Sequence, residues 1–143
     1  MQTKKSYSQA IKRIFRSEIT HCLTCQTRLR RCLTISQRTV VTLQQMIRVI
    51  HCGYCCPNRN CPDHQRLYRS TEADGLALPG FTFGLDIILL VGHLRLGEYR
   101  TVDEIHRLLM QRLAPLAQTI SRREILFLFE AYTALLRAGT EVQ

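Results

Sequence analysis

The stretch HCGYCCPNRNCPDH occupies residues 51–64 and holds four cysteines and two histidines within fourteen positions. Thiolate and imidazole groups are the side chains from which structural zinc sites are built. A shorter cluster, CLTC, lies upstream at residues 22–25. A C-x2-C pair on a tight turn directs two sulfur atoms at one ion, so the two clusters together predict a tetrahedral zinc site.

The upstream cluster offers two ligands, Cys22 and Cys25, whereas the dense stretch offers more than two. Cys56 and Cys61 form one pair with four residues between them, and Cys61 with His64 forms another. We take Cys22, Cys25, Cys56 and Cys61 as the ligand set. The alternates are Cys52, Cys55 and His64, and the cysteines that do not bind, Cys32 among them, are expected to be free thiols or packing residues.

Cysteine usage also bears on the redox state of the protein. The chain has seven cysteines, an odd number, and they cluster between residues 22 and 61. Residues 1–20 contain no apolar signal segment. Clustered cysteines without an export signal favour metal binding over disulfides. A redox enzyme is the competing interpretation, but nothing around Cys22 has the strand–helix–strand form of a thioredoxin motif.

Two short runs between the clusters predict the secondary structure of this half. RTVVTL at residues 38–43 and MIRVI at residues 46–50 are rich in β-branched residues and indicate short antiparallel strands. A hairpin between two ligand pairs is the plan of a zinc ribbon, which we place at residues 21–70. So short a segment with few large apolar side chains needs a metal ion to supply folding free energy.

The remaining segments favour helices. Residues 1–20 have apolar positions at helical spacing between basic ones, which predicts a basic N-terminal helix. Residues 71–81 are punctuated by glycine and proline and indicate a linker, and residues 82–143 indicate a helical domain. Thr101 with Glu104 and Ser121 with Glu124 predict capping boxes at two helix starts, and Gly139 predicts a helix end. The fold class expected is therefore small α+β, with a zinc ribbon followed by an all-α domain.

Charge divides the chain unevenly. Residues 1–70 carry thirteen Lys and Arg against two acids, whereas residues 71–143 carry seven Arg against nine acids. A basic half favours a polyanionic partner, and arginine suits contacts with phosphates and guanine edges. Double-stranded DNA is the partner expected. The residues expected to contact it are Arg28, Arg30, Arg31, Arg38 and Arg48 in the basic half, with Arg122 and Arg123 in the first turn of the last helix.

The combination of CLTC with RVIHCGYCCPNRNCPDH resembles the N-terminal zinc-binding ribbon of bacterial insertion-sequence transposases. Cys56, Asn58 and Cys61 match the second half of that motif, and Cys22 and Cys25 match the first. The segments YRSTEADGLALPGFTFGLDIILLVGHLRLGEYRTVDEIHRLL and TISRREILFLFEAY are similar to the helix-turn-helix region that follows in the family. The resemblance covers about residues 20–138 and implies zinc-dependent binding of the DNA of a mobile element during transposition.

The chain departs from the family in one respect. Such transposases continue into an RNase H-like domain whose three carboxylates bind two metal ions, and this sequence has no such constellation. We therefore expect a DNA-binding protein that is not itself an enzyme, located in the bacterial cytoplasm at the nucleoid and without a membrane span. A second copy of the chain or a transposase catalytic subunit is a further expected partner. The alternative function is a zinc-ribbon adaptor whose helical domain binds protein or dimerises, and the seven-residue segment LAPLAQT, longer than the usual helix-turn-helix turn, favours that alternative.

Overall fold

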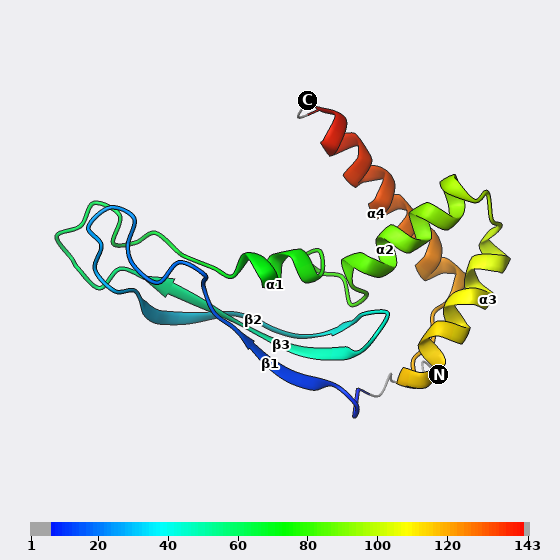
Figure 1. Cartoon of the computed structure of the whole chain (residues 1–143), viewed down its shortest axis with the longest axis horizontal. Helices are drawn as coiled ribbons and strands as arrows, with labels where there is room; N and C mark the ends of the chain where they lie inside the picture. Colours follow the sequence, from blue (N-terminus) through cyan, green and yellow to red (C-terminus); the bar gives the residue numbers. More distant parts are fainter. Residues whose placement is uncertain (1–6, 142–143) are drawn as a thin grey trace. The chain divides into compact units, whose positions relative to one another are not determined.

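The computed structural model describes the backbone of residues 7–141 and the side chains of residues 7–139. Within these residues the strands come first and the helices follow, which confirms the expected α+β class (Figure 1). The strands are β1 (Ile11–Phe15), β2 (Arg30–Val41) and β3 (Met46–Cys55), and the α-helices are α1 (Thr71–Leu76), α2 (Leu85–Gly92), α3 (Val102–Leu113) and α4 (Arg122–Glu141). A π-helical turn, His93–Gly97, extends α2, and a 3-10 turn, Ala114–Leu116, extends α3.

Two compact units make up the described chain. Residues 10–40 and 47–82 form the strand unit, and residues 7–9, 41–46 and 83–141 form the helical unit. The boundary near residue 82 lies where the composition changes in the sequence. The tip of the β2–β3 hairpin belongs to the helical unit, where the backbone N–H of Leu43 donates to the carboxylate of Asp86 at 2.9 Å.

The sheet has the strand order β1-β3-β2. Strands β2 and β3 form the expected hairpin and are longer than the runs at residues 38–43 and 46–50 suggested. Strand β1 pairs parallel to β3, with Ile11 opposite Ile47 and Phe15 opposite His51. The predicted basic helix over residues 1–20 is therefore wrong for residues 11–15, and residues 1–6 lie outside the described part. Pairing with β3 outweighs the helical spacing of the apolar residues, since isolated helical propensity is weak.

Helix α1 corrects the expectation of a linker at residues 71–81. Its buried residue Ala73, together with Ala77, which follows its last turn, packs against the sheet residues Phe15, Val40, Ile47 and Val49. The segment after α1 is fixed by Arg38, whose guanidinium donates to the backbone carbonyls of Leu78 at 2.8 Å, Ala77 at 3.0 Å and Phe81 at 3.2 Å. These bonds use three of the five N–H donors of Arg38 and give it a structural role, and its predicted contact with DNA stays a prediction.

In the helical unit both predicted capping boxes are present. Thr101 accepts from the backbone N–H of Glu104 at 3.2 Å, and Ser121 accepts from that of Glu124 at 3.0 Å. The core is formed mainly by α2, α3 and α4, and its fully buried side chains include Ile87, Ile88, Val91, Ile105, Leu109, Leu113, Ile125 and Leu128. Helices α2 and α4 cross closely (Figure 1), because Gly92 faces the ring of Tyr132, where a β-carbon would lie 2.3 Å away.

Helix α4 differs from expectation in two ways. It continues through Gly139 to Glu141, so the predicted helix end at that glycine is wrong. Its apolar sequence also predicts that Ile125, Leu126, Phe129 and Leu136 are mostly buried. Ile125 is buried and Phe129 half-buried, but Leu126 and Leu136 are 50% and 46% exposed. None of the helices in residues 7–141 is both long and apolar enough to cross a membrane.

The start of α1 generates a prediction about pH dependence. Glu18 accepts hydrogen bonds from the backbone N–H of Thr71 at 2.8 Å and from the hydroxyl of Ser70 at 3.0 Å. The backbone bond from Thr71 is the largest cause that lowers the pKa of Glu18, from 4.5 to about 2. A carboxylate whose folded pKa is depressed stabilises the protein above its unfolded pKa, and that stability is lost as the pH falls through the folded pKa.

Glu18→Gln should therefore lower the melting temperature at pH 7 and flatten its decline between pH 4.5 and 2, as measured by thermal melts. Glu130→Gln is the exposed control, and an unchanged acid limb in the Glu18 variant would contradict the assignment.

Candidate metal centre

The first cysteine pair lies on a tight turn between β1 and β2. The backbone N–H of Cys22 donates to the carbonyl of Thr27 at 2.8 Å, and that of Gln26 donates to the carbonyl of Cys22 at 2.9 Å. Gln26 closes the turn in the left-handed region, with a φ of 62°. This turn brings the sulfur atoms of Cys22 and Cys25 together.

The second pair lies on the loop that follows β3. The side-chain oxygen of Asn58 accepts from the backbone N–H of Asn60 at 3.1 Å, and its carbonyl accepts from that of Cys61 at 3.1 Å. These bonds fold the segment between Cys56 and Cys61 back on itself. Asparagine suits this position, because its short side chain closes a local turn on the backbone two residues ahead.

The two turns bring Cys22, Cys25, Cys56 and Cys61 into one group, the cysteine cluster, with all four sulfur atoms within 4.8 Å of one another. The sulfur atoms of Cys22 and Cys61 are 3.8 Å apart, and those of Cys25 and Cys56 are 3.4 Å apart. A tetrahedral zinc–thiolate site, with bonds of about 2.3 Å, has sulfur–sulfur edges of about 3.8 Å. The cluster therefore has the dimensions to hold a metal ion.

A small hydrophobic core surrounds the cluster. Leu29 and Tyr68 are buried against its cysteines, and Tyr54 is partly buried there. The hydroxyl of Tyr68 donates to the sulfur of Cys22 at 3.8 Å and accepts from the backbone N–H of Leu23 at 3.2 Å. Donors to sulfur are the outer contacts that orient and tune a thiolate site.

Local hydrogen bonds lower the pKa of the first pair. The backbone N–H of Cys25 is the main group that lowers the pKa of Cys22, followed by that of Thr24. The hydroxyl of Thr27 is the main cause that lowers the pKa of Cys25 to about 6. Thiolates are the metal-binding form of cysteine, so the lowered pKa values of Cys22 and Cys25 favour metal binding at this turn.

Burial has the opposite effect on the second pair. It raises the pKa of Cys56. At Cys61 the backbone N–H of Asp63 lowers the pKa, but burial and the neighbouring sulfurs of the first pair outweigh it and raise the pKa to about 12. A cation at the centre of the cluster favours the ionised form of all four sulfurs.

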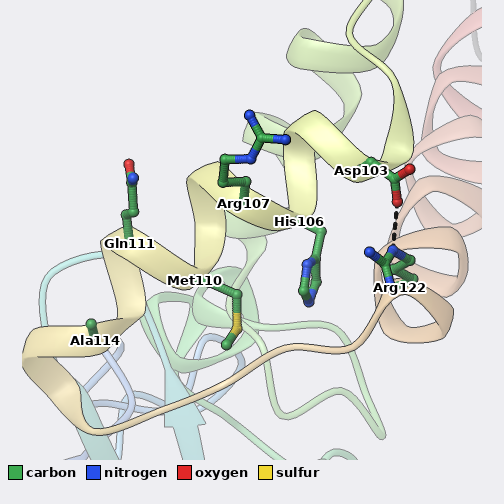
Figure 2. A pocket seen from close by; sticks show the side chains of 7 residues that line it. All are labelled: Asp103, His106, Arg107, Met110, Gln111, Ala114 and Arg122. Atoms are coloured by element: carbon green, nitrogen blue, oxygen red, sulfur yellow. Dashed lines mark hydrogen bonds and ion pairs between the residues drawn. The ribbon is translucent and has the colours of Figure 1, made fainter.

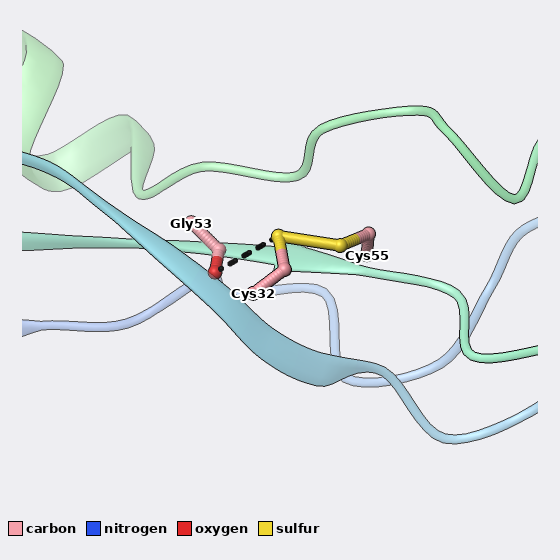
Figure 3. Close-up of a disulfide and its surroundings, with 3 residues drawn as sticks. All are labelled: Cys32, Gly53 and Cys55. Atoms are coloured by element: carbon pink, nitrogen blue, oxygen red, sulfur yellow. Dashed lines mark hydrogen bonds between the residues drawn. A yellow bond between two sulfur atoms is a disulfide. The ribbon is translucent and has the colours of Figure 1, made fainter.

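The alternates lie outside the cluster. Cys52 is fully buried as a free thiol, and the ring Nδ1 of His64 lies 3.3 Å from the carbonyl of Cys61. Cys55 forms a disulfide with Cys32, with α-carbons 6.0 Å apart (Figure 3). The expectation that both are free thiols is therefore corrected, because the hairpin places these residues of β2 and β3 at the usual α-carbon separation of a disulfide.

The predicted DNA-contacting arginines have different surroundings. Arg28, Arg30, Arg31 and Arg48 are exposed in the strand unit, and no carboxylate of the described residues pairs with them. Arg122 instead pairs with Asp103 of α3 at 2.5 Å, and both side chains are well exposed (Figure 2). Arg123 is exposed and outside that ion pair. At the start of α4, Arg122 therefore forms a salt bridge and Arg123 does not form one with a described carboxylate.

The Arg122–Asp103 pair borders an open pocket of the helical unit of about 540 Å³. His106, Arg107 and Met110 of α3 line it (Figure 2). Asp103 is the one acid of its lining and is paired with Arg122. Comparison with known proteins adds nothing to this geometry: no protein-family model, no curated protein and no solved structure matches the chain.

The adjacent residues Cys55 and Cys56 allow a matched test of the ligand set. Cys56→Ser should lose the bound metal, whereas Cys55→Ser should keep it, because only Cys56 belongs to the cluster. Metal per chain is measured by elemental analysis after anaerobic purification. When the protein is denatured with a chelator and without a reductant, a thiol reagent should modify five cysteines. The other two of the seven form the Cys32–Cys55 disulfide. Metal retention by Cys56→Ser with loss in Cys55→Ser would reverse the assignment.

Proposed function

We propose that the chain is a zinc-dependent DNA-binding protein of the insertion-sequence transposase type, without a nuclease centre of its own. The observation that carries the proposal is the cysteine cluster within a unit whose exposed arginines include several without acidic partners among the described residues. Zinc suits the cluster better than a harder cation, because four thiolates are soft ligands that select zinc in a tetrahedral site. Its bound ion would join the two turns and leave no open coordination position for catalysis.

The charge of the strand unit supports a polyanionic partner. Residues 10–40 and 47–82 contain eleven Lys and Arg against four acids. All four acids have local partners: Glu72 pairs with Arg13, Asp74 with Arg69, Asp63 with Thr24, and Glu18 with the start of α1. The remaining exposed arginines therefore have no carboxylate partner among the described residues, which suits phosphate contacts.

Arg28, Arg30, Arg31 and Arg48 are the phosphate-binding residues of the proposal. They come from the exit of the first cysteine turn and from β2 and β3, so the cluster and the sheet fix their backbones. Phosphate contacts give affinity and position without reading sequence. The strand unit would therefore supply most of the non-specific affinity.

Sequence readout is assigned to the start of α4. The Ser121 capping box places Arg122 and Arg123 in the first turn, where a cation opposes the helix dipole. Asp103 offsets that cost for Arg122, whereas no carboxylate of the described residues forms an ion pair with Arg123, which leaves its guanidinium for a base edge. Arginine in the first turn of a recognition helix is a frequent contact to guanine in the major groove.

A zinc-ribbon adaptor is the second candidate, and the surface of α4 favours it. Leu126 is half-exposed beside a small cavity of about 160 Å³ that is lined mainly by apolar side chains, among them Val91, Ile105 and Phe129. Such a surface suits a protein contact or a dimer. The two functions differ in their response to salt, because counterion release makes DNA binding, unlike apolar contact, fall steeply with ionic strength.

Replacing Arg30 and Arg48 by glutamine should weaken binding to a non-specific DNA duplex and make its salt dependence shallower. The slope of log K against log salt should fall in magnitude by roughly 0.9 for each phosphate that is no longer neutralised. Fluorescence anisotropy across a salt series measures both quantities. The matched control is Arg107→Gln with Arg112→Gln, two exposed arginines of α3. If the wild type shows no salt-dependent DNA binding, the adaptor function replaces this proposal.

The adjacent arginines of α4 provide a second test. Arg123→Gln should weaken binding to a duplex selected from a random library by roughly 1–3 kcal/mol, the range for one base contact. Arg122→Gln should change that affinity less, since it removes an exposed ion pair with Asp103 worth roughly 0–1 kcal/mol of stability. Titration of both variants against the selected duplex gives the comparison. Equal, unchanged affinities would make α4 a packing element.

A further inference from the structure

A second feature of the strand unit lies beside the cysteine cluster and has no part in holding the metal. It is a pocket of about 250 Å³ whose walls are more apolar than polar, called here the ribbon pocket. Its lining combines two arginines with an aromatic ring, two aliphatic side chains and two hydroxyl residues. These residues are Arg16, Arg28, Tyr54, Ile19, Leu29, Ser17 and Thr20.

Three segments of the chain build this pocket. The chain leaving β1 is turned by Ser17, whose hydroxyl accepts from the backbone N–H of Ile19 at 3.2 Å. It then runs beside the exit of the first cysteine turn, where the backbone N–H of Leu29 donates to the carbonyl of Thr20 at 2.9 Å. Tyr54 comes from the end of β3 and is held by two backbone bonds with Tyr68, at 2.8 and 2.9 Å.

The electrostatics of the ribbon pocket are positive throughout. Glu18 lies in the same segment as Arg16, but its carboxylate binds Ser70 and Thr71 at the start of α1 and does not line the pocket. Arg16 and Arg28 form no ion pair with a described carboxylate, unlike the nearby Arg13 and its partner Glu72. Two exposed guanidinium groups therefore meet at a recess with apolar walls.

We propose that the ribbon pocket receives one unpaired nucleotide of DNA, with its base or sugar against Tyr54, Leu29 and Ile19 and its phosphate on Arg16 and Arg28. The inference rests on the proposed DNA binding and specifies the form of DNA. A paired base is stacked inside a duplex and does not enter a recess, whereas an unpaired one offers both an apolar face and a phosphate. An aromatic ring beside arginines is the combination by which proteins hold single-stranded nucleotides.

The pocket also depends on the cysteine cluster. Leu29 and Tyr54 both pack against the cluster, and Arg28 follows the first cysteine turn directly. A metal ion that fixes the two turns thus fixes two walls of the pocket as well. Recognition of an unpaired nucleotide should consequently disappear when the metal is removed, together with the fold of this region.

The test compares two DNA probes on the full chain: a blunt hairpin, and the same hairpin carrying a short single-stranded oligothymidine tail. The wild type should bind the tailed probe about tenfold more tightly, a value within the range for stacking of one base on an aromatic ring. Arg16→Gln and Tyr54→Leu should bring this ratio of affinities close to one, while Tyr54→Phe should retain it. Arg59→Gln, an exposed arginine outside the pocket, is the matched control and should leave the ratio unchanged.

The outcomes separate this inference from the function on which it rests. Salt-dependent binding of the blunt hairpin without a preference for the tail overturns the pocket assignment and leaves DNA binding intact. Failure of the wild type to bind either probe overturns the proposed function. If the wild type binds a probe with an oligouridine tail more tightly than the probe with the oligothymidine tail, the assignment to DNA is overturned. The metal content of each variant shows whether that variant has folded. If Tyr54→Leu fails to fold, Arg16→Gln still tests the pocket, because Arg16 is exposed and lies outside the cysteine cluster.

Discussion

The meeting of two cysteine turns, one before β2 and one after β3, is the constraint on which the strand unit depends. The turns are separated by about thirty residues of sequence, and each is closed by its own backbone hydrogen bonds. The four sulfur atoms lie within 4.8 Å of one another, and this crowding and burial raise the pKa values of Cys56 and Cys61. A bound cation would stabilise the thiolates and link the two ends of the hairpin.

The arginines of β2 and of the turn before it differ in their surroundings. Arg38, toward the far end of β2, reaches the carbonyls after α1 and serves the fold. Arg28 and Arg30 lie where the chain passes from the cysteine turn into β2, and no described carboxylate engages them. Position along the chain therefore separates an arginine held by backbone carbonyls from exposed arginines without a carboxylate partner, although the residue type is the same.

Sequence patterns predict the local features of this chain and miss those that depend on distant partners. The C-x2-C spacing, the hairpin and the two capping boxes are each specified by residues close together in the chain, and all appear. The sequence of β1 instead suggests a helix, because its partner β3 lies about thirty residues away, and that of α1 suggests a linker, because Ala73 and Ala77 become meaningful only when a sheet covers them. The disulfide between Cys32 and Cys55 escapes prediction for the same reason, since strand register is not visible in cysteine spacing.

The sequence alone does not decide whether Cys55 or Cys56 belongs to the cysteine cluster, but the pleat of β3 does. Consecutive residues at the end of a strand point to opposite sides. Cys55 therefore reaches across to Cys32 of the neighbouring strand, while Cys56 turns into the cluster with the residues of the other cysteine turn. The cysteines at the end of β3 are thus divided between a covalent link to β2, made by Cys55, and the cysteine cluster, which contains Cys56 and Cys61. Tyr54 precedes both cysteines, packs against the cluster and lines the ribbon pocket. The end of β3 therefore positions the disulfide, one residue of the cysteine cluster and the aromatic ring of the pocket together.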